Sequence, residues 1–441
     1  MKKLLVIAYY FPPAGAVGVY RTLKFVKYLP QFGWEPVVLT VSNGKFPIYD
    51  QSLMKLIPEG LEVHRCPSFE ALNEGFDAPA GPPRGKTIGS RVRTRLFLAW
   101  NWVALPDVQA GWVPSAYRAA QRLIRNEGIR HVYISGYPFS SFLIGPKLRR
   151  SEGVRVAIDY RDPWTQSVNY PRRTALHRWI DRRLEAGVVR RSDLVISNTR
   201  HNDARMAAEF GQGAPRSKFI AIHNGFDNED FAPIPRGRNE RFTITYAGAF
   251  YYSIGSSFAD RAGDEVMKTY SPLYFFEALE AFLARRPEAR GTTRVRFMGV
   301  LGHGYDPIIQ QRGLEAVIER VGYIDYDEHL RVLKGADVLL LVLSRGEKSR
   351  GWIPSKFFQY LGTGNPILAL APAGEVRDII EETGGGICVE PDDVAAASRA
   401  IETLYDAWRT GASRAERDAS AAARYERRHL TAALARALDS M

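Results

Sequence analysis

The chain has 441 residues, of which 45% are hydrophobic and 24% are charged, and its formal net charge is +12. This composition excludes a disordered or fibrous protein, and the length predicts two or three hydrophobic cores. Only two cysteines occur, Cys66 and Cys388, which argues against a disulfide framework or a thiolate metal site and makes a reducing, cytoplasmic compartment the expected one.

The first half alternates short apolar runs with longer amphipathic ones. The N-terminal apolar stretch runs into Phe11-Pro12-Pro13 without a small-residue cleavage site, so a buried strand is favoured over a signal peptide. No run approaches the ~18 apolar residues of a membrane span. Strands are expected at residues 4–8, 36–40, 61–66, 131–135, 154–159, 194–197 and 219–222, helices at 21–31, 114–126 and 175–190, and a loop at 73–86.

A turn and a polar, Pro-containing stretch at residues 223–239 predict a hinge, after which the same pattern restarts. Strands are expected at 242–247, 295–299, 337–342, 366–369 and 386–389, with a strand-like turn at 321–324 and a helical tail from Val394. We therefore predict an α/β fold of two tandem Rossmann-like, doubly wound parallel-sheet domains with a ligand cleft between them. The expected domains are 1–235 and 236–410, and a C-terminal helix in 411–441 would cross back to the first domain.

Two segments of the first half carry candidate site residues. The turn after the first strand holds Gly15 and Gly18 and leads into a helix from Val19, so its backbone could approach a ligand near free helix amides; a purely geometric glycine turn is the alternative. Arg161 and Asp162 follow the strand 154–159 and would emerge at its carboxyl end. They could bind sugar hydroxyls or stabilise developing charge, whereas Asp162 could instead cap a helix that begins at Pro163.

The most specific segment lies in the second half. Pro354 and Ser355 are typical of a helix start, and the free amides there, with Ser355, Lys356 and Arg350, would form a diphosphate site that needs no metal. Gln359, one turn further, is placed to hydrogen-bond a ribose hydroxyl. The alternative is that Arg350 and Lys356 are surface cations.

No metal or other cofactor is expected. Asp325-Tyr326-Asp327 could hold a divalent cation, but Glu328-His329-Leu330 follows, and a helix start with acidic caps is favoured. The eight histidines are scattered.

Basic residues cluster in two places, the first of them beside aromatic residues. Arg91, Arg93 and Arg95 precede Trp100 and Trp102, and a second cluster contains Arg172, Arg173, Arg178, Arg182 and Arg183. Such groups suit the anionic surface of a membrane, and a buried helix with a solvated basic face is an equal alternative. No nucleic-acid module is recognisable, so no nucleic-acid partner is expected.

Together these segments resemble the family-four retaining glycosyltransferases of the GT-B superfamily, in particular bacterial members of cell-surface polysaccharide pathways. The likeness covers nearly the whole chain and is carried by segments of both halves: Phe11-Pro12-Pro13, Pro106-Asp107, Tyr137-Pro138-Phe139-Ser140-Ser141, Tyr160-Arg161-Asp162-Pro163-Trp164, Ala247-Gly248, Pro354-Ser355-Lys356 and Gly364-Asn365-Pro366.

The resemblance implies a nucleoside-diphosphate sugar bound mainly by the second domain and an acceptor bound mainly by the first. By this analogy Gly15, Gly18 and Gly248 lie near the donor, Lys356 faces the diphosphate and Gln359 the ribose. Tyr323 and Ile324 would lie near the base.

The chain departs from the family pattern at several positions. A pair of glutamates separated by seven residues is replaced by Gly351 and Gln359, and Glu347 is a candidate substitute for the first. The Arg and Lys after the first strand of the donor domain are missing, so Arg350 and Lys356 would carry the phosphate charge. Arg161 and Asp162 stand where many relatives have a His.

The predicted activity is metal-independent, retaining transfer of a sugar to a hydroxyl acceptor in cell-surface polysaccharide or glycolipid biosynthesis, at the inner face of the membrane, with Arg161, Asp162 and Lys356 as catalytic residues. A silent relative that acts as a binding or scaffold subunit, a nucleotide-sugar epimerase and a sugar-phosphate synthase remain alternatives.

Overall fold

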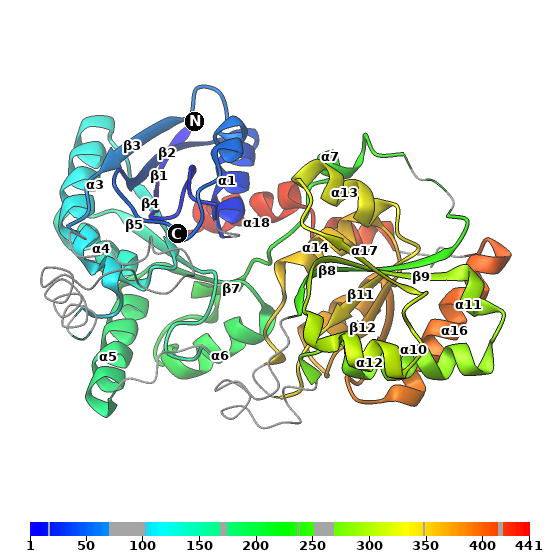
Figure 1. The fold of residues 1–441 in the computed structure, drawn as a ribbon. Coiled ribbons are helices and arrows are strands. Elements are labelled where there is room, and N and C mark those ends of the chain that lie inside the picture. The colour runs from blue at the N-terminus through cyan, green and yellow to red at the C-terminus, as the bar shows by residue number, and fades with distance from the viewer. Residues whose placement is uncertain are drawn as a thin grey trace, which may run out of the picture. The chain divides into compact units, whose positions relative to one another are not determined.

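The computed structural model divides the chain into two compact units (Figure 1). The first unit contains residues 1–223 and 427–441, and the second contains residues 224–426. The structure describes residues 1–15, 18–69, 102, 104–167, 174–235, 237, 239–250, 269–346, 349–412 and 418–441. The expected loop at 73–86, the residues Arg91, Arg93, Arg95, Trp100, Arg172 and Arg173, and the candidate Glu347 lie outside these ranges.

The first unit is built on a seven-stranded parallel sheet with the order β3-β2-β1-β4-β5-β6-β7. The chain winds outward from β1 in both directions, so the strand order reverses between β1 and β4, where α/β sheets bind ligands outside their carboxyl ends. The strands are β1 (Lys2–Ala8), β2 (Trp34–Val41), β3 (Glu62–Cys66), β4 (His131–Gly136), β5 (Arg155–Tyr160), β6 (Leu194–Ser197) and β7 (Phe219–Ala221).

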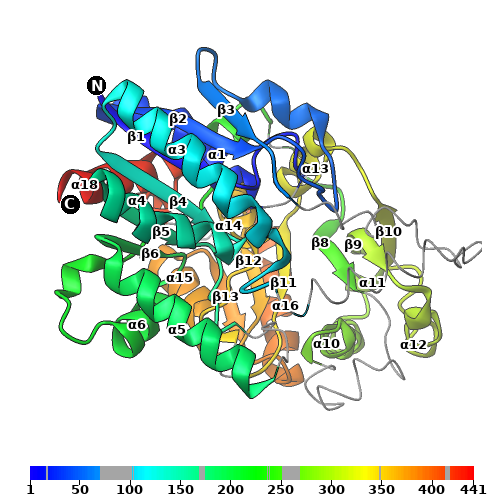
Figure 2. The same ribbon diagram turned by 90° about the vertical axis from the view of Figure 1, so that its left-hand side faces the viewer.

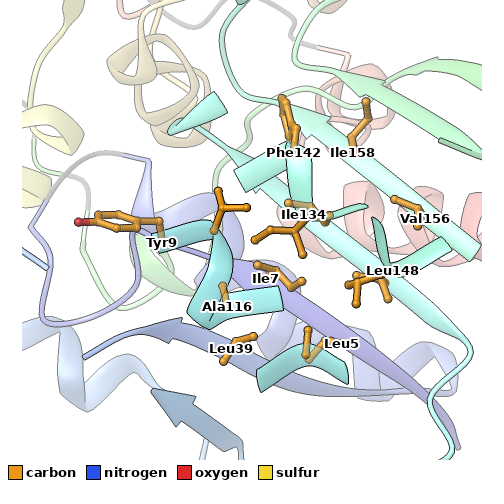
Figure 3. Packing of buried hydrophobic residues seen from close by; sticks show 14 of the residues in the cluster. Leu5, Ile7, Tyr9, Leu39, Ala116, Ile134, Phe142, Leu148, Val156 and Ile158 are labelled. Atoms are coloured by element: carbon orange, nitrogen blue, oxygen red, sulfur yellow. The ribbon is translucent and has the colours of Figure 1, made fainter. Parts of the chain in front are cut away.

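Both faces of this sheet are buried, which explains why its central strands read as continuous apolar runs. Leu5 and Ile7 point to one face, where Figure 3 shows them packed with Leu39, Ile134 and Val156. Leu4 and Val6 point to the other face, where side chains of the C-terminal helix join the core. The helices of this unit are α1 (Val19–Tyr28), α3 (Val113–Glu127), α4 (Ile144–Glu152), α5 (Ala175–Arg191), α6 (Arg200–Phe210) and α18 (Arg427–Asp439).

The second unit repeats the plan with a six-stranded parallel sheet in the order β10-β9-β8-β11-β12-β13. Its strands are β8 (Phe242–Phe250), β9 (Thr293–Leu301), β10 (Ile318–Gly322), β11 (Val338–Val342), β12 (Ile367–Leu370) and β13 (Gly386–Val389). Helices cover both faces, with α10 and α16 in one cluster and α14 and α15 in the other. The helices are α7 (Asn228–Phe231), α10 (Leu273–Arg285), α11 (Ala289–Thr292), α12 (Asp306–Gln311), α13 (Tyr326–Lys334), α14 (Ser355–Thr363), α15 (Glu375–Thr383), α16 (Val394–Thr410) and α17 (Ala419–Ala423).

Every strand expected from the sequence is present, and two expectations at segment ends were wrong. Residues 321–324, expected as a strand-like turn, only end a strand: β10 spans Ile318–Gly322 and pairs with β9. No helix starts at Pro163, because the chain makes a non-helical turn at residues 161–167. The next helix that the structure describes begins at Ala175, where the side chain of Thr174 caps it. Within the described residues, no helix is both long and apolar enough to span a membrane.

Candidate active site

In the first unit, the candidate residues lie at the carboxyl edge of the sheet, where β1, β4 and β5 end. The turn after β1 is held in place by Gly15, whose amide donates to the carbonyl of Ile48 at 2.8 Å. A Cβ at Gly15 would come within 2.8 Å of the Ile48 side chain, so the close approach requires glycine. The helix expected from Val19 begins there as α1, with Gly18 as its N-cap residue.

Gly18 and Arg161, predicted separately from the sequence, lie against each other. A Cβ at Gly18 would be 1.4 Å from a terminal nitrogen of the Arg161 guanidinium, so no other residue fits without moving that side chain. Burial lowers the pKa of Arg161. The guanidinium forms no hydrogen bond with any residue that the structure describes. A cation therefore lies at the amino end of α1, where an anion or a polar oxygen would be favoured by both charge and dipole.

A buried ion pair near Arg161 fixes the end of β5. It was not predicted from the sequence. Arg21 of α1 donates to both carboxylate oxygens of Asp159, at 2.7 and 2.8 Å, and to the carbonyl of His223 at 2.9 Å. The hydroxyl of Tyr133 donates to the same carboxylate. Burial opposes the charge of Arg21, but Asp159 outweighs it and raises the pKa of Arg21. The pair ties α1 to β5 directly before Arg161; Asp162 has an exposed side chain.

Two further buried carboxyls hold the loops at this edge. Asp107 accepts the amide and the hydroxyl of Ser140, at 3.0 and 2.6 Å, and so fixes the segment after β4; burial raises its pKa to about 6 although Ser140 opposes the shift. Glu185 of α5 accepts the amide and the hydroxyl of Thr165 in the loop after β5. Burial raises the pKa of Glu185 to about 7, again against the effect of Thr165. Neither role could be predicted, since each partner is remote in sequence.

In the second unit, α14 begins at Ser355, as the sequence predicted, and its N-terminus has no side-chain cap. The N-cap residue is Pro354, which has no side-chain acceptor, and the side chain of Ser355 is exposed. The first amides of a helix have no intrahelical carbonyl to bind, so this end suits an anion.

Lys356 turns back from this helix end onto the middle of β8. Its ammonium donates to the carbonyl of Ala247 at 2.9 Å and lies 3.8 Å from the centre of the Tyr246 ring. The amide of Ala247 donates to the hydroxyl of Tyr360 at 2.8 Å, so α14 binds both polar groups of this residue. Burial lowers the pKa of Lys356 to about 7. Tyr246 and Tyr360 were missed because they are ordinary core aromatics in sequence.

Gly248 is required beside Lys356. It has a φ of 140°, and a Cβ there would lie 2.9 Å from the Lys356 ammonium. Its partner in the β8–β9 pairing, Gly299, has a φ of 104°, and a Cβ on it would lie 2.3 Å from the carbonyl oxygen of Gly248. The two glycines let the backbones of β8 and β9 and the Lys356 ammonium approach one another closely.

The other predicted donor residues are spread around α14. The side-chain oxygen of Gln359 lies 3.4 Å from Nε2 of His329 on α13, so it faces that helix. Arg350 is exposed, and its carbonyl accepts the amide of Glu375 at the start of α15 at 2.9 Å. Tyr323 is 79% exposed just after β10, and Ile324 packs on the core of this unit. Asp325 caps α13 by accepting the amide of Glu328 at 2.9 Å, which confirms the predicted helix start.

Among the described residues, one cluster has the composition of a metal site: Glu62, His64 and Glu127. It involves the strand β3 at its amino end and the last residue of α3, away from the carboxyl edge. Lys3 forms an ion pair with Glu127 at 3.0 Å and so competes with a cation.

Comparisons with known proteins give a match to one family model over part of the chain and a shared fold over all of it. Residues 15–225 match the family model of the glycosyl transferase 4-like domain. No curated protein matches the chain by sequence.

Solved structures match over the whole chain. Sucrose-phosphate synthase from Thermosynechococcus elongatus is 16% identical, with 99% of this chain and 98% of that chain covered and a TM-score of 0.58. HepE of Anabaena, in complex with UDP and glucose, is 15% identical with both chains fully covered, 100% each, and a TM-score of 0.57. The lipopolysaccharide outer core galactosyltransferase WaaB is 12% identical, with 100% and 99% covered and a TM-score of 0.57.

Proposed function

We propose that this chain is a glycosyltransferase that uses a nucleoside-diphosphate sugar, because residues 15–225 match the model of the glycosyl transferase 4-like domain and the chain has the GT-B fold. The proposal rests mainly on the contact between α14 and β8. There an uncapped helix N-terminus, the Lys356 ammonium and the closely packed backbone of Gly248 and Gly299 adjoin one another. This combination suits a diphosphate, which needs amide donors, one cation and close approach of the backbone.

The proposed reaction is transfer with retention, without a metal ion. The diphosphate leaves with its charge stabilised by the α14 amides, Ser355 and Lys356, with Arg350 as a second cation from the same unit. The acceptor hydroxyl attacks from the face that the diphosphate leaves, and its proton passes to the departing phosphate oxygen. Gln359 binds the ribose, and Tyr323 and Ile324 lie beside the base.

We propose that the acceptor binds to the first unit. The guanidinium of Arg161 forms no hydrogen bond with a described residue, and with Asp162 and the turn of Gly15 and Gly18 it offers both donors and an acceptor for hydroxyl groups. Solved structures of the same fold include a sucrose-phosphate synthase and a lipopolysaccharide outer core galactosyltransferase. We propose a glycan or lipid-linked acceptor of cell-surface polysaccharide synthesis, met at the inner face of the membrane.

A thermal-shift screen with UDP, GDP, ADP and TDP and their common sugars tests the donor class. We expect one nucleotide family to raise the melting temperature equally with magnesium and with a chelator. The shift should disappear in Lys356→Ala and persist in Arg399→Ala, which removes an exposed cation of the same unit. A magnesium-dependent shift would refute the metal-free site, and no shift with any nucleotide would favour a silent relative.

The stereochemical part needs a separate measurement. Once a donor is known, the anomeric proton of the product, followed by NMR before mutarotation, should show the configuration of the donor. Inversion would refute retention, and interconversion of the donor sugar without an acceptor would identify an epimerase.

A further inference from the structure

The N-terminal half of α5 exposes large apolar side chains where a soluble helix would carry polar ones. Leu176 is 63% exposed and Trp179 is 55% exposed, one turn apart on the same face. Trp102, from a different part of the chain, is 63% exposed and its ring lies edge-on to that of His177, 4.7 Å away. Its carbonyl oxygen lies 2.9 Å from Nε2 of His177, which fixes it beside the helix.

The charges of α5 are separated by sign. Both acidic residues of the helix, Asp181 and Glu185, are buried, at 1% and 0% exposed. The exposed charged residues are all arginines: Arg178, Arg182, Arg183, Arg190 and Arg191. An exposed face with this composition strongly favours a negatively charged partner.

Arginines and aromatic residues alternate on this face. The guanidinium of Arg183 lies 4.6 Å from the centre of the Trp179 ring. Arg182 also pairs with Glu209 of α6 at 2.5 Å, so α6 supplies the nearest acidic group. Tryptophan and arginine both bind at the level of lipid headgroups, where the ring enters the boundary of the acyl chains and the cation meets phosphate.

The helix that carries most of this face is tied to the Arg161 loop. Leu176 and Trp179 lie in the first two turns of α5, the end of the helix that follows β5 and the Arg161 loop along the chain. Glu185 ties that loop to α5 through Thr165. Figure 2 shows α5 at the outer surface of the first unit, beside α6.

We infer that Trp102, Leu176, Trp179 and Arg183, which we call the α5 face, form a docking surface for an anionic lipid bilayer. This inference rests on the proposed function for its purpose, because docking would bring a lipid-linked acceptor to the edge that carries Arg161. A bilayer is favoured over an acidic protein because the exposed side chains combine indole rings and Leu176 with arginine cations, a mixture that suits the level of lipid headgroups.

The test is sedimentation of the full chain with phosphatidylcholine vesicles, with and without phosphatidylglycerol, at low and high salt. We expect binding only to the anionic vesicles, weakened by salt. Arg183→Glu should weaken binding about 30-fold, since each unit of charge changes membrane affinity about fivefold. Trp179→Ala should also weaken it, and Arg399→Glu, the same charge change in the second unit, should bind as wild type does.

The outcomes separate this inference from the proposed function. Donor binding in the absence of vesicles should be the same in Arg183→Glu, Trp179→Ala and wild type, because neither residue belongs to the donor site. Equal binding to neutral vesicles, no binding to either, or unchanged binding by both variants would overturn the inference. Binding to an acidic polymer such as heparin but not to anionic vesicles would also overturn it and point to a macromolecular partner.

Discussion

At the amino end of α1, one glycine and one arginine depend on each other. The position of Gly18 allows no Cβ while Arg161 lies against it. The Arg161 side chain is flexible, so a methyl group at Gly18 would displace the guanidinium and leave the fold intact.

We therefore expect Gly18→Ala to lower donor turnover by about 10- to 100-fold, the range for losing one hydrogen bond to a charged group. Arg161→Ala should lower it by a similar factor. The double variant should be no worse than either single variant, since both remove the same interaction. Steady-state kinetics on the three variants tests this, with Gly187→Ala on α5 as the control; fully additive losses would show that the two residues act independently.

A second prediction concerns the single residue Gly248. Its φ of 140° disfavours any side chain, and a Cβ would meet the Lys356 ammonium at 2.9 Å. We expect Gly248→Ala to lower the free energy of unfolding by about 1–3 kcal/mol and to weaken donor binding. Gly291, where a Cβ would meet no heavy atom within 4 Å, gives the matched control Gly291→Ala. Denaturant unfolding and calorimetry measure the two effects, and normal donor affinity in Gly248→Ala would contradict the placement of the diphosphate.

The role of a residue could be predicted only where a short segment of sequence indicates it. The glycines near the strand ends and the helix start at Ser355 are visible in short segments, and the structure has Gly18 against Arg161 and Gly248 against Lys356. The pair of Arg21 and Asp159 and the contact of Tyr360 with Ala247 were not predictable, because each joins residues far apart in the chain.

At the scale of elements, the helix α14 should make donor binding depend on pH through Lys356. Burial holds the pKa of this residue in the free protein at about 7, below its ordinary value. Below pH 7 the ammonium is present before the donor binds. Above pH 7 it is largely neutral, and a diphosphate must draw a proton from solution to form the charged pair.

Donor affinity should therefore be highest below pH 7 and fall as the pH rises through that value, with uptake of about one proton per donor bound above it. Calorimetry in two buffers of different ionisation enthalpy measures the uptake. The Lys356→Arg variant, which stays charged, should show none. An affinity that is independent of pH in the wild type would contradict a neutral Lys356 in the free protein.

The contact between α5 and the loop after β5 gives a stability prediction of known sign. Burial raises the folded-state pKa of Glu185 from its ordinary value of about 4.5 to about 7. Below pH 4.5 the carboxyl is protonated in both states and burial costs no charge. Between pH 4.5 and 7 the unfolded state ionises more readily, so the free energy of unfolding falls as the pH rises.

Glu185→Gln removes this dependence and keeps an acceptor for Thr165. We expect it to gain stability relative to wild type as the pH rises from 4.5 to 7, by at most about 3 kcal/mol. Calorimetric melting across this range measures it, with Glu59→Gln, an exposed carboxyl, as the control. A constant difference between variant and wild type would show that Glu185 is ionised throughout.

Element types were predictable from periodicity, and element ends were less so. Continuous apolar runs identified the central strands of both parallel sheets, because these strands are buried on both faces. The strand β10, which is only partly buried, was expected as a strand-like turn. The segment after Tyr160 was wrongly given a helix start as one alternative, since Asp162-Pro163 has the form of a cap and the actual turn is held by the distant Glu185.

For the whole molecule, the repeat of one plan in two units was the most predictable feature. Both units are parallel sheets covered on both faces, and their fold is that of GT-B glycosyltransferases. The second unit ends at residue 426, and the final helix α18 packs in the core of the first unit beside Leu4 and Leu23. The donor base, the sugar and the acceptor are set by side chains that no segment pattern identifies.

The measurement that tests the central claim most directly is a calorimetric titration of the full chain with the nucleotide sugar found by the thermal-shift screen, in the presence of a chelator. The account predicts saturable binding to one site, at least about tenfold weaker in Lys356→Ala and unchanged in Arg399→Ala. Binding that requires a metal ion, or that is equally tight in Lys356→Ala, would contradict the claim that α14 and β8 form the diphosphate site.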